Sequence, residues 1–154
     1  MSGIYTVEKP VKAPPESHFR LNITQLVQEA IGESGFAEGH VIIQTKHTTT
    51  GLGLLVQEDE RGLMDDFLRL LERIVPEGDY YRHDDFSKRT ENLGPEERKN
   101  AVSHLRALFF PTSLTLVFRN RQLQLGPWQS VLLFDFDPEG RPFRTLIIQV
   151  CGEK

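Results

Sequence analysis

The segment from residue 112 onward constrains the fold most, because it carries strand patterns and almost no helical pattern. Residues 112–118 alternate apolar and polar side chains, which is typical of a strand with one buried face. A hairpin connection is expected at 120–122, followed by strands at 123–125, 131–136 and 143–150. A Pro- and Gly-containing turn joins the last two strands. We expect these four strands to be antiparallel.

Three helices are expected in the preceding part of the chain. The first follows Asn22-Ile-Thr-Gln25, which resembles a capping box, and Gly32 or Gly35 can end it. The second spans 59–75, where apolar residues recur at helical spacing before Pro76. The third opens at 94–97, with proline and carboxylates in its first turn, and Pro111 ends it.

Two further strand regions precede the second helix. Residues 4–7 predict a short strand, and 40–50 predict a central strand that 51–56 extends after a bend or bulge at its glycines. Three helices with six or seven strands indicate the α+β class. The length of 154 residues, without repeats or linkers, predicts one domain over 1–154.

Composition excludes several classes of function. The formal net charge is -4 and no dense Lys/Arg run occurs, so we expect no nucleic-acid binding. The single cysteine, Cys151, forms no internal disulfide and lacks partners for a thiolate metal site. The N-terminus does not resemble a signal peptide, and no apolar run reaches the ~20 residues that cross a bilayer. A cytoplasmic protein without membrane association is expected.

The segment 77–93 has no clean period and carries seven consecutive polar or aromatic residues at 79–85. Loops of this length without secondary structure are uncommon and tend to be functional. His83 lies in it, followed by Asp84 and Asp85. Carboxylates can fix an imidazole tautomer or complete a metal site, and a mixed set suits zinc, manganese or iron better than magnesium alone. No closely spaced metal motif is present.

Two other histidines lie in informative places. His47 would share a strand face with Val41 and Ile43, which fits either a hydrogen-bonded core residue or a ligand. His104 lies roughly 100° from the centre of the third helix's apolar face, so it either leans toward a pocket or is solvated. Trp128 and Gln129 form either part of a ligand site, where the indole stacks on a ring and the amide contacts polar atoms, or a packed turn.

Taken together, several short motifs resemble the YjbQ-type family, whose members are often labelled secondary thiamine-phosphate synthases. The motifs occur in one order along nearly the whole chain: His47-Thr-Thr-Thr-Gly-Leu, Val56-Gln-Glu58, Tyr81-Arg-His83, Asn100-x-x-x-His104, Leu123-x-Leu-Gly-x-Trp-Gln129 and Gln149-Val-x-Gly-Glu153. The resemblance implies a mostly antiparallel, β-sandwich-like core with about three helices packed on one side. It also implies a homotrimer with a polar pocket near the subunit contacts.

The resemblance further implies an activity and a site. The activity joins a pyrimidine diphosphate to a thiazole phosphate, giving thiamine phosphate and pyrophosphate. The implied catalytic residues are His83, His104 and Glu58; the substrate-binding residues are Arg82, Asn100, Trp128 and Gln129; the ligands of a divalent zinc or magnesium ion are His47, His83, His104 and Asp84. Lys46, Arg82 and Arg106 are candidates to neutralise the leaving pyrophosphate.

The chain departs from the family pattern at three places. Val102 replaces a frequent second histidine, 110–113 reads Phe-Pro-Thr-Ser, and Pro127 precedes the Trp-Gln pair. An alternative function is therefore kept: a metal- or small-ligand-binding trimer without synthase activity, or a metal-assisted hydrolase. The acidic composition of the chain favours this alternative, since two phosphorylated substrates call for a basic pocket.

Overall fold

The computed structural model describes residues 1–12, 20–56 and 62–154 and has the expected α+β architecture. Glu58 and the expected start of the second helix lie outside these residues. None of the described helices is both long and apolar enough to cross a membrane. The elements are β1 Ser2–Val11, β2 Arg20–Asn22, α1 Thr24–Ser34, β3 Glu38–Thr45, β4 Thr50–Leu55, α2 Gly62–Ile74, η2 Arg82–Asp84 (a 3₁₀ turn), α3 Ala101–Ala107, β5 Ser113–Arg119, β6 Gln122–Leu123, β7 Ser130–Asp135 and β8 Arg144–Glu153.

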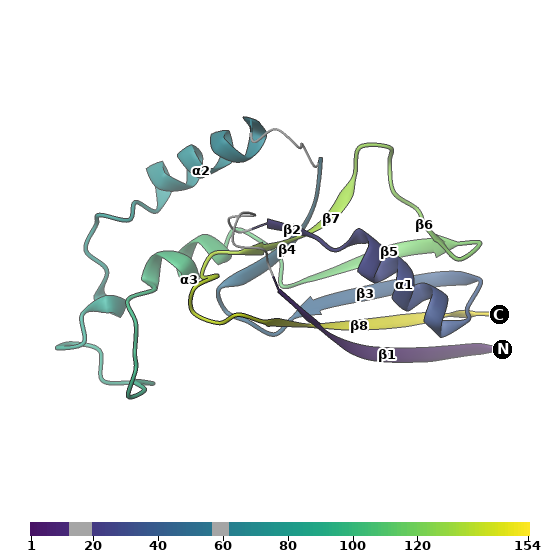
Figure 1. The fold of residues 1–154 in the computed structure, drawn as a ribbon, viewed down its shortest axis with the longest axis horizontal. Coiled ribbons are helices and arrows are strands. Elements are labelled where there is room, and N and C mark those ends of the chain that lie inside the picture. Colours follow the sequence, from purple (N-terminus) through teal and green to yellow (C-terminus); the bar gives the residue numbers. More distant parts are fainter. Residues whose placement is uncertain (13–19, 57–61) are drawn as a thin grey trace.

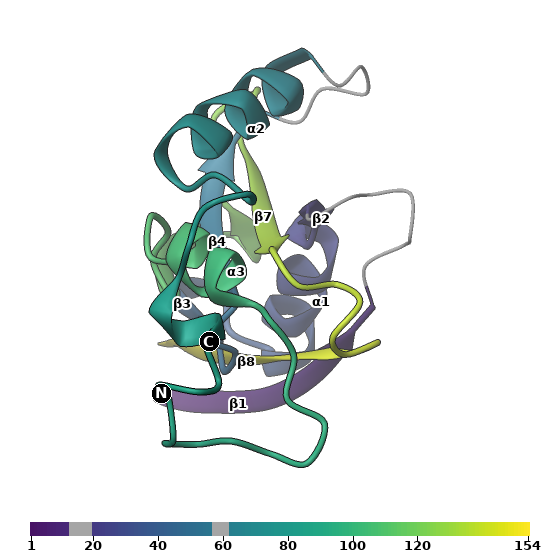
Figure 2. The ribbon, with the colours of Figure 1, turned by 90° about the vertical axis from the view of Figure 1, so that its left-hand side faces the viewer.

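The described strands form two antiparallel sheets (Figure 1). One sheet has the order β1-β8-β3-β5-β6 and the other has the order β2-β7-β4. Helix α1 contacts strands of both sheets, and its buried residues join a main core built from the inner faces of the sheets. Figure 2 shows α1 beside β8 and β1, with α2 and α3 near β4 and β7.

Strand β1 is longer than the expected 4–7 and contains Pro10. It lies at the edge of its sheet and pairs only with β8 among the described strands. An edge strand tolerates proline because one row of its amides faces away from the ladder. The strand therefore continues through Pro10 to Val11.

Helix α1 begins without the expected capping box. Its N-cap is Ile23, with no side-chain cap, and Asn22 accepts instead from the Thr24 amide at 2.9 Å. The Gln25 side chain bonds Glu29 rather than reaching back. The end of the helix is as expected, since Gly35 takes the left-handed conformation with φ 71°.

The expected strand over 40–50 is wrong, because it divides between the two sheets. Strand β3 ends at Thr45, and β4 begins at Thr50 in the three-stranded sheet. The glycines of β4 permit close packing rather than a bulge. A Cβ on Gly51 would lie 2.3 Å from Cβ of Phe110. His47 consequently lies in a tight connection and not on a strand face.

Strand β7 is buried on both faces. Val131 and Leu133 join the main core, while Leu132 and Phe134 face a second core formed with Met64 of α2. Aromatic rings fill this second core, with Phe67, Phe110, Phe134 and Phe136 at centroid distances of 4.5–6.5 Å. The three-stranded sheet is thus a middle layer of the molecule.

The expected hairpin at 120–122 is confirmed. Arg119 pairs with Gln122, and Asn120 and Arg121 both have positive φ, of 51° and 60°. These are the conformations that a two-residue hairpin turn requires. The last two strands do not pair with each other, because β7 lies between β2 and β4 whereas β8 lies between β1 and β3.

The third helix begins later than expected. Residues 94–100 are not helical, and α3 starts at Ala101. Glu97 is used elsewhere, because it accepts from the Gly94 amide and pairs with Arg89. The first amides of α3 are capped by the distant Asp84, whose Oδ1 accepts from the amides of Asn100 and Ala101 at 3.0 Å each.

Candidate functional site

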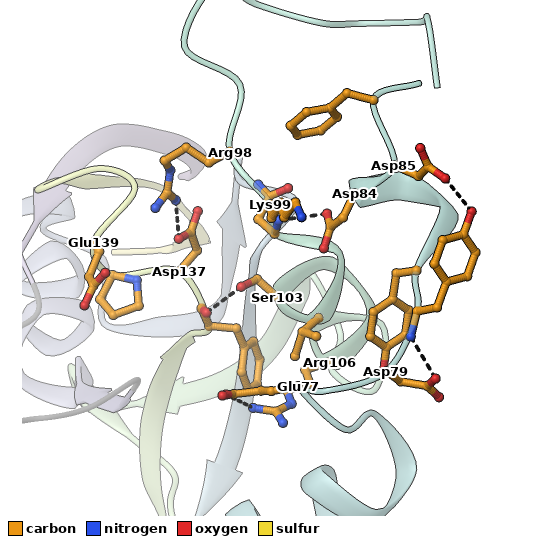
Figure 3. A pocket seen from close by; sticks show the side chains of 17 residues that line it. Glu77, Asp79, Asp84, Asp85, Arg98, Lys99, Ser103, Arg106, Asp137 and Glu139 are labelled. Carbon is orange, nitrogen blue, oxygen red and sulfur yellow. Dashed lines mark hydrogen bonds and ion pairs between the residues drawn. The ribbon is translucent and has the colours of Figure 1, made fainter. Parts of the chain in front are cut away.

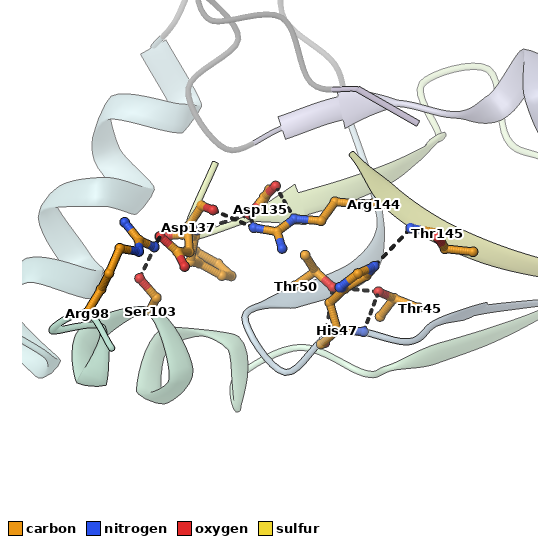
Figure 4. A network of polar contacts seen from close by, with 10 residues as sticks. Thr45, His47, Thr50, Arg98, Ser103, Asp135, Asp137, Arg144 and Thr145 are labelled. Atoms are coloured by element: carbon orange, nitrogen blue, oxygen red, sulfur yellow. Dashed lines mark hydrogen bonds and ion pairs between the residues drawn. The ribbon is translucent and has the colours of Figure 1, made fainter. Parts of the chain in front are cut away.

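His47 is fixed by the connection between β3 and β4 (Figure 4). Its Nε2 accepts a 2.9 Å hydrogen bond from the Thr145 amide at the start of β8. The hydroxyl of Thr50 donates to the His47 carbonyl at 3.2 Å, and Thr45 and Thr50 bond each other through their hydroxyls. Because Nε2 accepts, the neutral ring carries its proton on Nδ1.

The environment of His47 favours the neutral ring. Burial lowers the pKa of His47 below its ordinary value, and the positive charges of Arg144 and Arg141 lower it further. The carboxylate of Asp135 acts in the opposite direction but is the weaker influence. His47 is therefore a neutral hydrogen-bonding group at neutral pH.

A buried ion pair joins the two sheets beside His47. Arg144 of β8 donates from Nε to Oδ2 of Asp135 at 2.7 Å and from Nη2 to Oδ1 at 2.8 Å. Both residues are 3% exposed. Arg144 also donates to the carbonyl of Asp137, so the pair fixes the start of the loop between β7 and β8. Bidentate pairing is what a buried Arg and carboxylate need to offset desolvation.

His47 and His104 line one polar cavity of about 400 Å³, which we call the histidine pocket. The connection after β3, the segment before α3, the helix α3 and the loop after β7 all contribute to it. The lining residues are Lys46, His47, Thr48, Thr49, Glu96, Glu97, Arg98, Asn100, His104, Asp137, Gly140, Arg141 and Arg144. Four of these side chains are cationic and three are carboxylates.

The cationic side chains of the histidine pocket differ in how far they are engaged. Arg98 pairs with Asp137, and this pairing raises the pKa of Arg98. Arg144 forms the buried ion pair with Asp135. Lys46 forms an exposed pair with Glu8 at 3.1 Å. Arg141 forms no ion pair with another residue of the described ranges. It is therefore the cation most available to an anionic ligand.

His83 packs against the ring of His104 and does not itself line the histidine pocket. The two ring centroids are 5.0 Å apart with an interplanar angle of 66°. Nε2 of His83 is 3.3 Å from Oδ1 of Asn100. The structure thus places His47 and His104 in one pocket and packs His83 against His104.

Arg89 contacts His83 from the other direction. Its Nη1 lies 3.0 Å from Nε2 and 3.3 Å from Nδ1 of His83, and its Nη2 pairs with Glu97. The bond from Arg89 lowers the pKa of Glu97, and the Gly94 amide lowers it further. Arg89 is not among the site residues predicted from the sequence.

As arranged, the expected metal ligands do not fit a divalent ion. His47 uses Nε2 for the Thr145 amide, Asp84 uses Oδ1 for two amides of α3, and His83 contacts Arg89. Within the part of the chain that the structure describes, no three His, Cys, Asp or Glu side chains are grouped to hold a metal. A metal on this set stays a prediction.

A second cavity of about 950 Å³ lies against the other side of α3 and the segment 79–86 (Figure 3). Carboxylates outnumber cations in its lining, with Glu77, Asp79, Asp84, Asp85, Asp137 and Glu139 against Arg98, Lys99 and Arg106. Most of these carboxylates have partners. Asp85, for example, accepts from Tyr80 Oη at 2.7 Å, and its bonds to Ser87, Tyr80 and Lys88 hold its pKa well below the usual range.

The expected substrate-binding residues do not all gather at the histidine pocket. Asn100 lines both cavities, whereas Arg82 is exposed and lines neither. Trp128 is 77% exposed, and the Gln129 side chain accepts from the Gly126 amide at 2.8 Å. Trp128 and Gln129 therefore belong to an exposed turn, separate from the two cavities.

Sequence reasoning missed the contribution of the loop between β7 and β8. The segment 137–142 was expected to be only a turn, yet it brings Arg141 and Asp137 to the pocket. One signal was available. Asp135 interrupts an apolar strand and Arg144 begins the next one, and buried charges in strands require partners. No comparable signal points to Arg89.

Comparison with known proteins identifies one family over nearly the whole length of the chain. A model of the family described as "UPF0047 protein YjbQ-like" matches residues 11–153. A UPF0047 protein of Archaeoglobus fulgidus is 33% identical over 129 residues, covering 84% of this chain and 88% of the relative. A UPF0047 protein of Methanothermobacter thermautotrophicus is 28% identical over 150 residues, covering 97% and 94%.

A solved structure shows the same fold. The crystal structure of a YbjQ-like protein of unknown function from Sulfolobus solfataricus superimposes with a TM-score of 0.79. It is 25% identical, and the match covers 99% of this chain and 100% of that one.

Proposed function

Because the chain belongs to the UPF0047 YjbQ-like family, we propose that its histidine pocket binds a phosphorylated small molecule. The observation that carries the proposal is the pocket itself, where His47 and His104 lie among Lys46, Arg98 and Arg141. Imidazoles and guanidinium groups placed together are suited to phosphoryl oxygens, since they offer several charge-assisted donors.

The distribution of charge supports this proposal. The chain carries a net charge of -4, which argues against phosphate binding when charge is considered as an average. The two cavities differ, however. Carboxylates predominate in the 950 Å³ cavity, while the histidine pocket has a small excess of cations. The lining of the pocket therefore has one more cation than carboxylate, although the chain as a whole is acidic.

The two histidines of the pocket have different roles in this proposal. His47 is neutral and accepts from the Thr145 amide through Nε2, so its Nδ1 is left to donate to a ligand. The His104 ring forms no hydrogen bond with another residue of the described ranges. We assign proton transfer to His104, and ligand positioning to His47.

The activity that we propose to test is the joining of a pyrimidine diphosphate to a thiazole phosphate. The bond from the pyrimidine methylene carbon to the diphosphate oxygen breaks as the bond to the thiazole nitrogen forms. Arg141 and Lys46 would stabilise the departing pyrophosphate, and His104 would supply its proton.

The experiment is an assay of the purified chain with both precursors, reading thiamine phosphate and pyrophosphate. We expect product, and we expect His104→Gln to lower kcat by about a hundredfold or more. Arg141→Met should raise KM, while Arg119→Met, an exposed arginine of β5, serves as the matched control. Absence of product from the folded chain rejects the synthase.

Calorimetric titration with pyrophosphate separates binding from catalysis. The alternative function, a ligand-binding protein without synthase activity, predicts that pyrophosphate binds and that Arg141→Met weakens it by about tenfold. If pyrophosphate does not bind the wild-type chain, the proposal of a phosphate pocket is wrong. Metal analysis of the purified chain and of His83→Ala and His104→Ala tests the predicted metal separately.

A further inference from the structure

Arg89 is enclosed by three side chains that together would suit a cation. Its Nη1 is 3.0 Å from Nε2 of His83, and its Nη2 pairs with Glu97. Its Cζ lies 5.4 Å from the centroid of the Phe86 ring, in cation–π contact. The Arg89 side chain is only 15% exposed, although it belongs to an irregular loop.

The groups around this guanidinium are ligands that zinc-like metals prefer. An imidazole and a carboxylate contact Arg89 directly, and the His104 ring lies 5.0 Å from the His83 ring. A guanidinium has only donors, so it takes the imidazole lone pair that a metal would need. It also neutralises the Glu97 carboxylate.

We propose that Arg89 occupies the cation position of the His83–His104 pair and thereby excludes a divalent metal from it. In this chain, the charge that the resemblance assigns to an ion is supplied by an arginine side chain. The inference goes beyond the proposed function and does not depend on which ligand the histidine pocket binds.

One further observation supports this role. Arg89 Nε is buried without a hydrogen-bond partner in the described ranges, and a buried unpaired donor costs free energy. The guanidinium keeps its place between His83 and Glu97 in spite of this cost. Removing the guanidinium would free the His83 imidazole and the Glu97 carboxylate that it now contacts, beside the His104 ring, and these are ligand types that zinc prefers.

The test compares zinc binding by the wild-type chain and by Arg89→Gln, with isothermal titration calorimetry on the full chain. We expect little binding by the wild type and an affinity about tenfold or more higher in Arg89→Gln, at one ion per chain. Adding His83→Ala to Arg89→Gln should abolish the gain. Arg89→Lys keeps the charge and should not gain affinity, and Arg69→Gln, on the exposed face of α2, should resemble the wild type.

Two results would overturn the proposal. One is a folded Arg89→Gln that binds zinc no better than the wild type. The other is observed on the wild-type chain alone and so does not require that the variant folds. One equivalent of zinc should leave the NMR signals of the His83 and His104 rings unshifted, and a shift of both would show that Arg89 does not exclude the metal.

Discussion

The amide of Thr145 donates a 2.9 Å hydrogen bond to Nε2 of His47. The bond joins the connection after β3 to the first residues of β8, and it fixes the tautomer of a ring that lines the histidine pocket. Pocket geometry and strand pairing are therefore linked through one imidazole.

Substitution of His47 should affect stability according to whether an acceptor is retained. In His47→Ala the half-buried Thr145 amide loses its partner, which we expect to cost about 1–3 kcal/mol. His47→Gln places an amide oxygen at similar reach and should cost clearly less. Urea denaturation of both variants gives the comparison, and equal losses would show that the bond contributes little.

Stability should decrease on mild acidification because of His47. Burial and the neighbouring Arg144 and Arg141 lower the pKa of the folded ring, so below pH of about 6.5 the unfolded chain binds more protons. The free energy of unfolding should therefore fall as pH drops from about 6.5 through the folded pKa. His47→Gln cannot titrate and should lose this part of the slope. Denaturation midpoints measured from about pH 7.5 to about pH 5 test this, and identical slopes would contradict it.

Breaking the buried pair of Asp135 and Arg144 should be costly. Arg144→Met leaves a buried carboxylate without its bidentate partner, and we expect a loss of about 3–5 kcal/mol or failure to fold. Asp135→Asn should cost less, because its amide oxygen still accepts one bond.

The double variant with Asp135→Leu and Arg144→Met separates charge from packing. It removes both buried charges, so its loss should be smaller than the sum of the single losses. Additive losses by thermal or urea denaturation would show that the two side chains act independently.

The resemblance predicts a homotrimer, which light scattering coupled to size-exclusion chromatography can test. A trimer should elute with a mass three times the 17.7 kDa of the chain. Dilution to low micromolar concentration should leave that mass unchanged, and a monomer at all concentrations would contradict the prediction.

Local patterns predicted much of the fold. Alternation identified β5, and turn chemistry identified the hairpin at Asn120, because both depend on neighbouring residues. The division of 40–50 between two sheets was not predictable, since Phe110, far along the chain, decides the packing of Gly51. The start of α3 was misplaced for the same reason, because its cap is Asp84 and not a local residue.

The candidate site was only partly predictable. The motifs indicated His47 and His104 from chemistry-bearing residue types, and these two line one pocket. Arg89 and Arg141 gave no such signal, because an isolated arginine in a polar loop looks like any solvated side chain. Their roles depend on which loops the fold brings together, and periodicity does not determine that.

The position of β8 has a consequence for how the molecule acquires its fold. Strand β8, residues 144–153, lies between β1 and β3. Tyr5 of β1 and Val41 of β3 therefore both pair with Val150 and not with each other. Until that strand docks, β1 and β3 present open hydrogen-bonding edges. Such long-range closure slows folding and leaves early intermediates prone to self-association, so expression yield should respond to chaperones and temperature more strongly than native stability would suggest.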